Sequence, residues 1–246
     1  MSEVPGERIA KVIARAGLCS RREAERLVEA GRVAVNGETL TTPARNVAAA
    51  DVVTVDGKPV AAPGRARLYR FHKPPATIVA ASDPRGRRTI YDRLPPDLPR
   101  LMPVGRLDYN SEGLLLLTTD GGIKRHLELP ATGWLRRYRV RAHGEPPTPE
   151  ALASLARGVT VEGVAYGPIE AAIDRRQGSN CWLTMALREG RNREVRRVLA
   201  DLGLQVNRLI RTAYGPFQLG QLEPGELDEI SPKVMRDQLG GAFAGS

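Results

Sequence analysis

Apolar residues recur at intervals of three and four positions near the start of the chain. This spacing predicts an amphipathic helix over residues 8–16 and a second one from Ser20 to about Ala30. Ser20 and Glu23 have the spacing of a capping box, in which each side chain satisfies a backbone N–H at the start of a helix. The chain is therefore predicted to begin with a pair of helices.

Short alternating runs and turn dipeptides follow the two helices. The predicted strands span residues 33–35 and 51–55, and the predicted turns lie at Asn36-Gly37 and Asp56-Gly57. Asn-Gly favours the type I′ turn of a β-hairpin. Residues 7–60 are thus predicted to form a small α+β module. Residues 61–67 contain proline and glycine without core periodicity, which predicts a linker.

From residue 68 onward, apolar runs typical of strands and helical stretches alternate irregularly. The predicted strands span residues 68–71, 77–81, 101–107, 114–118, 137–142, 181–187 and 206–211. The predicted helices span residues 89–94, 123–129, 148–158 and 192–202, with Asn192 as the N-cap of the last, and Asp120-Gly121 is interpreted as a turn. Many strands with scattered helices predict an α+β domain over residues 68–232 with a large antiparallel sheet. Residues 233–246 are predicted to be a flexible tail.

Charge narrows the class of partner. Hydrophobic residues make up 41% of the chain, which excludes a disordered protein. Among 246 residues, 37 are basic and 28 acidic, for a net charge of +9. This surplus favours a polyanionic partner, either a nucleic acid or a membrane surface. The surplus is concentrated: residues 8–32 contain seven basic against three acidic residues, and residues 65–106 contain ten against three.

Cysteine and histidine are too sparse for a metal site. Cys19 and Cys181 lie 162 positions apart, and the three histidines do not supply zinc-ligand spacings. We therefore expect neither a structural metal nor a disulfide framework. The start of the sequence lacks the features of a signal peptide, and the apolar run at 114–117 is much shorter than a membrane helix. A cytoplasmic protein is the expectation.

The two predicted helices and the hairpin after them have the sequence RIAKVIARAGLCSRREAERLVEAGRVAVNG. This segment resembles an S4 RNA-binding domain. The resemblance implies that residues 7–60 form an S4-like module, which presents Arg21, Arg22 and Arg32 to the phosphates of a structured RNA. It also favours RNA as the polyanion.

A carboxylate stands at a predicted junction of strand and loop in the segment VGRLDYNSEGLLLLTTDG. Asp108 follows Arg106 by two residues, and glycines on both sides allow close approach of the backbone. From the spacing alone, an ordinary solvated aspartate is the simpler interpretation. The segment is similar, however, to the GRLD motif of pseudouridine synthases, in the branch that modifies ribosomal RNA. Ser111 and Thr119 replace a threonine and an asparagine of the family pattern.

Three further segments resemble the same family. They are FHKPPATIVAASDPRGRRTIYDRLP, RRYRVRAHG and LREGRNREVRRVLADLGLQVNRLIRTAYGPFQL. With the S4-like module, the resemblance covers about residues 7 to 232. It implies an α+β enzyme in which residues 68–232 form a pseudouridine synthase catalytic domain on a large mixed, mainly antiparallel sheet.

The resemblance implies roles for three residues in a reaction that cuts the N1–C1′ bond of a uridine and rejoins the base through C5. Asp108 would stabilise the positive charge that develops on the ribose, either by attacking C1′ or by helping to form a glycal. Tyr138 would hold the detached base and relay the C5 proton. Arg196 would pair with Asp108. Its competitors in the same Arg-rich segment are Arg191, Arg193 and Arg197.

A uridine inside a paired helix has to be flipped out of the stack before it can react. Arg106 is expected to occupy the gap that the uridine leaves. The other candidates for contact with RNA phosphates in this domain are Lys73, Arg85, Arg87, Arg88, Arg191 and Arg193.

The forms of the GRLD and Arg-rich segments look most like the B type among the large-subunit enzymes of the family, which implies 23S ribosomal RNA as the substrate. A 16S ribosomal RNA enzyme is the alternative. A non-catalytic S4-containing RNA-binding or ribosome assembly protein is another alternative, and the presence of Asp108, Tyr138 and Arg196 argues against it. We expect no cofactor, no metal, no membrane partner, and a monomer by default.

Overall fold

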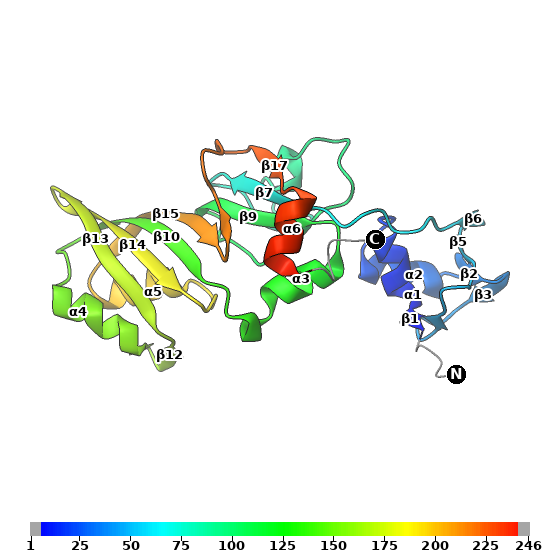
Figure 1. Cartoon of the computed structure of the whole chain (residues 1–246), viewed down its shortest axis with the longest axis horizontal. Coiled ribbons are helices and arrows are strands. Elements are labelled where there is room, and N and C mark those ends of the chain that lie inside the picture. The colour runs from blue at the N-terminus through cyan, green and yellow to red at the C-terminus, as the bar shows by residue number, and fades with distance from the viewer. Residues whose placement is uncertain (1–5, 241–246) are drawn as a thin grey trace.

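The computed structural model describes residues 6–240, and a small α+β module forms its first part (Figure 1). The elements of this module are α1 (Ile9–Arg15), α2 (Arg21–Glu29), β1 (Glu7–Arg8), β2 (Val33–Val35), β3 (Glu38–Leu40), β4 (Asn46–Val47), β5 (Val53–Val55) and β6 (Lys58–Pro59). The strands β3-β2-β5-β6 form one antiparallel sheet, and β1 pairs with β4. Ile13, Val28 and Val33 belong to one buried cluster, which joins both helices to this sheet.

Local signals in the sequence determine how this module begins. Ser20 Oγ accepts a hydrogen bond from the Glu23 N–H at 3.2 Å, which confirms the predicted N-cap of α2. Asn36 and Gly37 have φ angles of 51° and 86°, as a type I′ turn requires. Because these signals act within four residues, they are readable from the sequence alone.

A nine-stranded mixed sheet forms the second part of the chain. Its strands are β7 (Leu68–Lys73), β8 (Met102–Val104), β9 (Glu112–Thr118), β10 (Arg136–His143), β13 (Ile169–Gln177), β14 (Asn180–Leu187), β15 (Gln205–Tyr214), β16 (Phe217–Gln218) and β17 (Leu227–Glu229). They lie in the order β13-β14-β10-β15-β9-β7-β17, with β16 beside β15 and β8 beside β9. Only the β15–β9 pair is parallel among the described residues, which confirms the prediction of a mixed, mainly antiparallel sheet.

Helices and short turns cover this sheet. They are α3 (Gly121–Glu128), α4 (Pro149–Ser154), α5 (Glu194–Asp201) and α6 (Pro232–Leu239), with the 3₁₀ turns η1 (Tyr91–Arg93), η2 (Pro130–Thr132) and η3 (Leu155–Arg157) and a separate hairpin of β11 (Val159–Val161) and β12 (Val164–Tyr166). None of the helices within residues 6–240 combines the length and the apolar character that a bilayer-spanning segment needs.

Strand β9 is buried along its whole length because both faces of the sheet are covered there. Leu114 and Leu116 belong to one buried cluster, and Leu115 and Leu117 belong to another. The alternation of side chains along a strand thus explains the run of four leucines. Full burial of one leucine side chain contributes about 1.5–3 kcal/mol, so this strand is a strong anchor for the loop before it.

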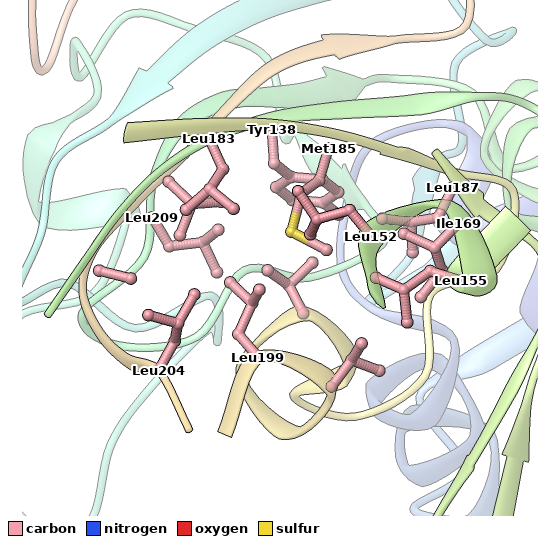
Figure 2. Close-up of a cluster of buried hydrophobic side chains, with 14 of the residues drawn as sticks. Tyr138, Leu152, Leu155, Ile169, Leu183, Met185, Leu187, Leu199, Leu204 and Leu209 are labelled. Atoms are coloured by element: carbon pink, nitrogen blue, oxygen red, sulfur yellow. The ribbon is translucent and has the colours of Figure 1, made fainter. Parts of the chain in front are cut away.

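Strand β10 faces a core on one side only. Tyr138, Val140 and Ala142 are buried, whereas the arginines between them are exposed. The buried residues share a cluster with Val198 and Leu199 of α5. Figure 2 shows Tyr138 beside Met185 of β14 in this cluster, in line with their direct pairing in the sheet. The cluster therefore fixes α5 against the sheet.

Three local predictions are wrong. Residues 77–81 form no strand but only one isolated bridge, between Ile78 and Thr89. Asp120 is the N-cap of α3, since its Oδ1 accepts the N–H groups of Gly122 and Ile123 at 2.8 Å each. The N-cap of α5 is Arg193 in a left-handed conformation, not Asn192. Residues 77–81 lack the further bridges that a strand needs. Asp120 satisfies free N–H groups at a helix start, and α5 has its N-cap one residue later than predicted.

The predicted flexible tail from residue 233 is also wrong as far as the structure describes it. Helix α6 begins at Pro232 and is capped by Ser231, whose Oγ accepts from the Val234 N–H at 3.3 Å. Met235 and Leu239 are buried in the cluster that also contains Leu68. This packing stabilises a helix of eight residues, which is too short to be stable on its own in water. Residues 241–246 of the predicted tail lie outside the described residues.

Candidate active site

Asp108 lies in the loop 105–111, which connects β8 to β9. Its side chain is 30% exposed. The loop is held at both ends: the Ser111 N–H donates to the Asp108 carbonyl at 3.0 Å, and the Gly105 N–H donates to Glu128 Oε1 of α3 at 2.6 Å. Lys124 Nζ donates to the same Glu128 oxygen, so α3 clamps the start of the loop. The carboxylate is therefore presented on a fixed backbone.

Lys73 supports the same loop from inside the protein. Its side chain is fully buried, and Nζ donates to the carbonyls of Pro74, Tyr109 and Ser111 at 3.0, 3.2 and 2.7 Å. Burial lowers the pKa of Lys73 to about 8, although Asp108 and Glu112 favour its charged form. The prediction that Lys73 contacts RNA phosphate is wrong, because its side chain is fully buried and its ammonium group is bound by three backbone carbonyls.

Two arginines face the Asp108 carboxylate. Arg196 Nε lies 3.7 Å and Arg193 Nη1 lies 3.8 Å from Asp108 Oδ2. Arg196 Nη1 also donates to the Val206 carbonyl at 3.1 Å, and its Nη2 donates to Ser111 Oγ at 3.4 Å. Burial and the charge of Arg193 lower the pKa of Arg196, against the opposite effect of Asp108. Asp108 thus lies beside two cations, one half-buried and one exposed.

The other arginines of this segment have different partners. Arg191 Nε lies 2.9 Å from Glu189 Oε2. Arg197 is hydrogen-bonded to Tyr166, which raises its pKa. Within the segment, the sequence-based choice of Arg196 as the partner of Asp108 therefore agrees with the geometry, and Arg193 joins it. Arg193 has a φ of 53°, a conformation that costs roughly 1–3 kcal/mol in residues other than glycine and that recurs at functional sites.

Tyr138 contributes to the same cavity from β10. A β-bulge in the pairing of β10 with β15 falls between Arg137 and Tyr138, and Tyr138 lies opposite Arg211. Bulges re-aim side chains and are frequent beside active sites. Tyr138 is 8% exposed, so one side of it packs in the core and the other borders the cavity.

The cavity has a volume of about 700 Å³, within the range of small-ligand pockets. Charged and aromatic residues share its lining with apolar ones. The charged and aromatic residues include Asp108, Tyr138, Arg106, Arg191 and Arg193, and the apolar ones include Leu187, Val195 and Leu209. Arg106 is exposed. Within the described part of the chain, ten charged residues line the cavity together with this apolar surface. Such a lining suits a ligand that has both a flat apolar part and charged or polar groups.

Two buried charged residues of this cavity were missed by the sequence analysis. Arg211 is 2% exposed, and its Nε donates to the Leu114 carbonyl at 2.7 Å. Glu194 is 3% exposed, and its Oε2 accepts from the Arg191 N–H at 2.9 Å. Burial raises the pKa of Glu194. Both stand in Arg-rich stretches that are typical of an exposed surface, and no local signal distinguishes them.

In the first module, Arg21 and Arg22 are exposed at the start of α2. Arg32 is exposed too, but it already has a partner: its Nε and Nη2 donate to the two Asp56 carboxylate oxygens at 2.7 and 2.6 Å. Within residues 6–240, histidine, cysteine, aspartate and glutamate side chains form no group of three or more that could hold a metal ion.

Comparison with known families decides the identity. Residues 7–53 match the S4 domain, and residues 67–201 match the RNA pseudouridylate synthase family. The chain belongs to the RNA pseudouridylate synthase family. This enzyme therefore combines an RNA-binding S4 domain with a pseudouridine synthase domain, which confirms both resemblances seen in the sequence.

Relatives of the enzyme match almost its whole length. It is 41% identical over 232 residues to an uncharacterized RNA pseudouridine synthase of Rickettsia prowazekii, covering 94% of this chain and 97% of the relative. It is 41% identical over 245 residues to ribosomal large subunit pseudouridine synthase B of Haemophilus influenzae, covering 96% and 68%. A solved pseudouridylate synthase aligns with a TM-score of 0.66 at 25% identity, over 95% of this chain and 100% of the other.

Proposed function

We propose that the enzyme converts one uridine of 23S ribosomal RNA to pseudouridine, with Asp108 as the catalytic carboxylate. The observation that carries the proposal is a carboxylate on a fixed loop, beside two guanidinium groups, at the wall of a cavity of about 700 Å³. The relatives named ribosomal large subunit pseudouridine synthase B support the choice of 23S RNA.

The chemistry requires a negative group near the ribose. When the N1–C1′ bond breaks, its electron pair leaves with the uracil and C1′ becomes positive. Asp108 either attacks C1′ and forms a covalent bond, or helps to remove the C2′ proton and form a glycal. The uracil then rotates and C5 bonds to C1′, which releases Asp108 from C1′ in the covalent route and is accompanied by return of the C2′ proton in the glycal route. C5 loses its proton and N1 takes one up, so the product is an isomer of the starting uridine. Arg193 and Arg196 keep the carboxylate oriented through these steps.

Tyr138 is proposed to hold the detached uracil. Its position between the core and the cavity supports this role, because a base that rotates needs a flat apolar surface that does not move. The Tyr138 hydroxyl is proposed to relay the C5 proton toward solvent.

The target uridine is proposed to enter the cavity after it leaves the RNA helix, at a cost of a few kcal/mol for lost stacking and pairing. Arg106, which is exposed at the cavity, is proposed to fill the gap in the RNA. Arg191 and Arg193 are proposed to contact the neighbouring phosphates, and Arg21, Arg22 and Arg32 to bind a more distant part of the same RNA.

The test uses transcripts of 23S and 16S RNA that carry tritium at uridine C5. The wild-type enzyme is expected to release tritium from the 23S transcript, and Asp108→Asn is expected to reduce the rate at least ~10³-fold. Asp97→Asn is the control, since Asp97 is an exposed aspartate outside the cavity. Release from 16S RNA alone would move the substrate to the small ribosomal subunit. Undiminished release by Asp108→Asn would overturn the role of Asp108.

A further inference from the structure

An exposed aromatic ring stands at the mouth of the catalytic cavity. Five large hydrophobic side chains are exposed among the described residues: Leu18, Val52, Tyr109, Leu129 and Val234. Tyr109 is the aromatic one, with 39% of its surface exposed. It follows Asp108 directly and lines the same cavity. Aromatic side chains that stay in water beside a binding site are frequent contacts for single-stranded or unstacked bases.

The backbone of Tyr109 is rigid although its ring is open to solvent. Its carbonyl accepts hydrogen bonds from Lys73 Nζ at 3.2 Å and from the Thr77 N–H at 3.3 Å. Lys73 is itself fully buried. A ring on such a backbone loses little conformational freedom when a ligand binds, because few bonds remain free to rotate.

Arg87 covers one face of the ring. Its guanidinium carbon lies 5.7 Å from the ring centroid of Tyr109. Arg87 Nε and Nη2 donate to the two carboxylate oxygens of Asp83 at 3.0 and 2.9 Å, so the guanidinium is held in that position. The arginine supports the ring from one side and leaves the opposite face of the ring without this contact.

We propose that Tyr109 stacks on the nucleobase next to the target uridine in the bound RNA. This inference rests on the proposed function, because it places the uridine at Asp108. When the uridine leaves the stack, its neighbour loses one stacking partner, and a rigid aromatic ring one residue from Asp108 is placed to replace it. The neighbouring base binds the ring face opposite Arg87. Tyr109 thus contributes to RNA binding and to the choice of site, and it takes no part in bond cleavage.

The first experiment measures kcat and KM for tritium release from the 23S transcript. Tyr109→Ala is expected to raise KM roughly 5- to 150-fold, the range for the loss of one stacked base, with kcat within threefold. Tyr109→Phe keeps the ring and is expected to stay within twofold of the wild type in both. Leu129→Ala is the matched control, because Leu129 is also 39% exposed but does not line the cavity.

The variant Tyr109→Leu distinguishes aromatic stacking on a base from a nonspecific apolar contact. If the ring stacks, the leucine variant is expected to resemble Tyr109→Ala; if it resembles Tyr109→Phe instead, stacking is ruled out. A loss of kcat in Tyr109→Ala with an unchanged KM would also overturn the proposal. Thermal unfolding of each variant shows whether it is folded, and the leucine and phenylalanine variants keep the size of the side chain.

A binding experiment distinguishes a failure of this proposal from a failure of the proposed function. Asp108→Asn serves as the parent, and its affinity for the 23S transcript is compared with that of Asp108→Asn combined with Tyr109→Ala. Weaker binding by the double variant supports stacking even if the wild type releases no tritium, and equal binding overturns it. Absence of tritium release by the wild type counts against the proposed substrate.

Discussion

At the scale of single residues, Lys73 shows how a buried charge can position the loop that carries Asp108. An ammonium group has three donors, and Lys73 uses them on the carbonyls of Pro74, Tyr109 and Ser111. Tyr109 and Ser111 belong to the loop segment that directly follows Asp108. Without the lysine these carbonyls lose their partner, and an unsatisfied buried polar group costs about 1–3 kcal/mol.

The pH dependence of stability tests this interpretation. The pKa of Lys73 is about 8 in the folded state and 10.5 without burial, so the folded state holds fewer protons between these values. The stability of the wild type relative to Lys73→Met is therefore expected to rise between pH 8 and 10.5, by up to roughly 3 kcal/mol, and to be constant below pH 8. Urea unfolding followed by tryptophan fluorescence measures it, since both tryptophans, Trp134 and Trp182, lie in the catalytic part. A difference that does not vary with pH would contradict the assignment.

The sequence predicted the pairing of Asp108 with Arg196 better than it predicted which charged residues are buried. Asp108 and Arg196 were found through motifs, and the geometry brings them within 4 Å. Lys73 was assigned to RNA because a lysine in a basic stretch is usually solvated, but in the folded chain it is buried against the carbonyls of Tyr109 and Ser111. Arg211 was missed for the same reason. Whether a charge is buried depends on strands far away in the sequence, which local patterns do not encode.

At the scale of elements, the approach of β15 to β9 depends on one glycine. Gly113 has a φ of +100°, and a Cβ at this position would lie 2.7 Å from the Arg211 nitrogen and would overlap the neighbouring carbonyl. Gly113 and Arg211 are also register partners in the parallel pair. Only a residue without a side chain allows the two strands to meet here.

Gly113→Ala is therefore expected to destabilise the catalytic part by about 3 kcal/mol or more, from backbone strain and steric overlap together. Activity is expected to fall as well, because β9 carries the Asp108 loop. Gly121→Ala provides the comparison: a Cβ there meets nothing within 4 Å, and alanine favours the helix that begins at this residue. Chemical denaturation of both variants measures the difference. Equal stability would show that the strands can separate without loss.

Elements were predictable where their signals are local. The caps at Ser20 and Thr148 lie within three residues of the N–H groups that they satisfy. The predicted strand at 77–81 and the predicted tail fail because the outcome depends on distant partners. Residues 77–81 form only one isolated bridge. Helix α6 is stabilised by a core that includes Leu68 and Leu114, more than a hundred residues away in sequence.

At the scale of the whole molecule, the basic surplus is spread over two separate parts that RNA can bridge. Figure 1 shows α2 and β13 at opposite ends of the molecule. The S4 domain has exposed arginines on α2, and the catalytic cavity has its own arginines. If one RNA binds both parts, the phosphate contacts of each part contribute to the same affinity. No contact between the two parts of the protein is needed for this gain.

The salt dependence of RNA binding measures this contribution. For Arg21→Ala combined with Arg22→Ala, the slope of log affinity against log salt is expected to become shallower by about 1.5–2, roughly one for each phosphate that the variant no longer neutralises. Arg175→Ala combined with Arg176→Ala removes the same charge from exposed positions on β13. This control is expected to leave the slope nearly unchanged. Equal changes in both pairs would mean that only net charge matters.

The pairing of β15 with β9 is short, and this has a consequence for RNA binding. β15 pairs with β10 over eight registered positions but with β9 over only two. The Asp108 loop is attached to β9, whereas Tyr138 and Arg196 lie on β10 and α5, across that short junction. We expect an RNA that contacts both sides to hold them together across this short pairing. Bound substrate would then stabilise the positions of Asp108 and Tyr138 relative to each other, because a ligand stabilises the arrangement to which it binds.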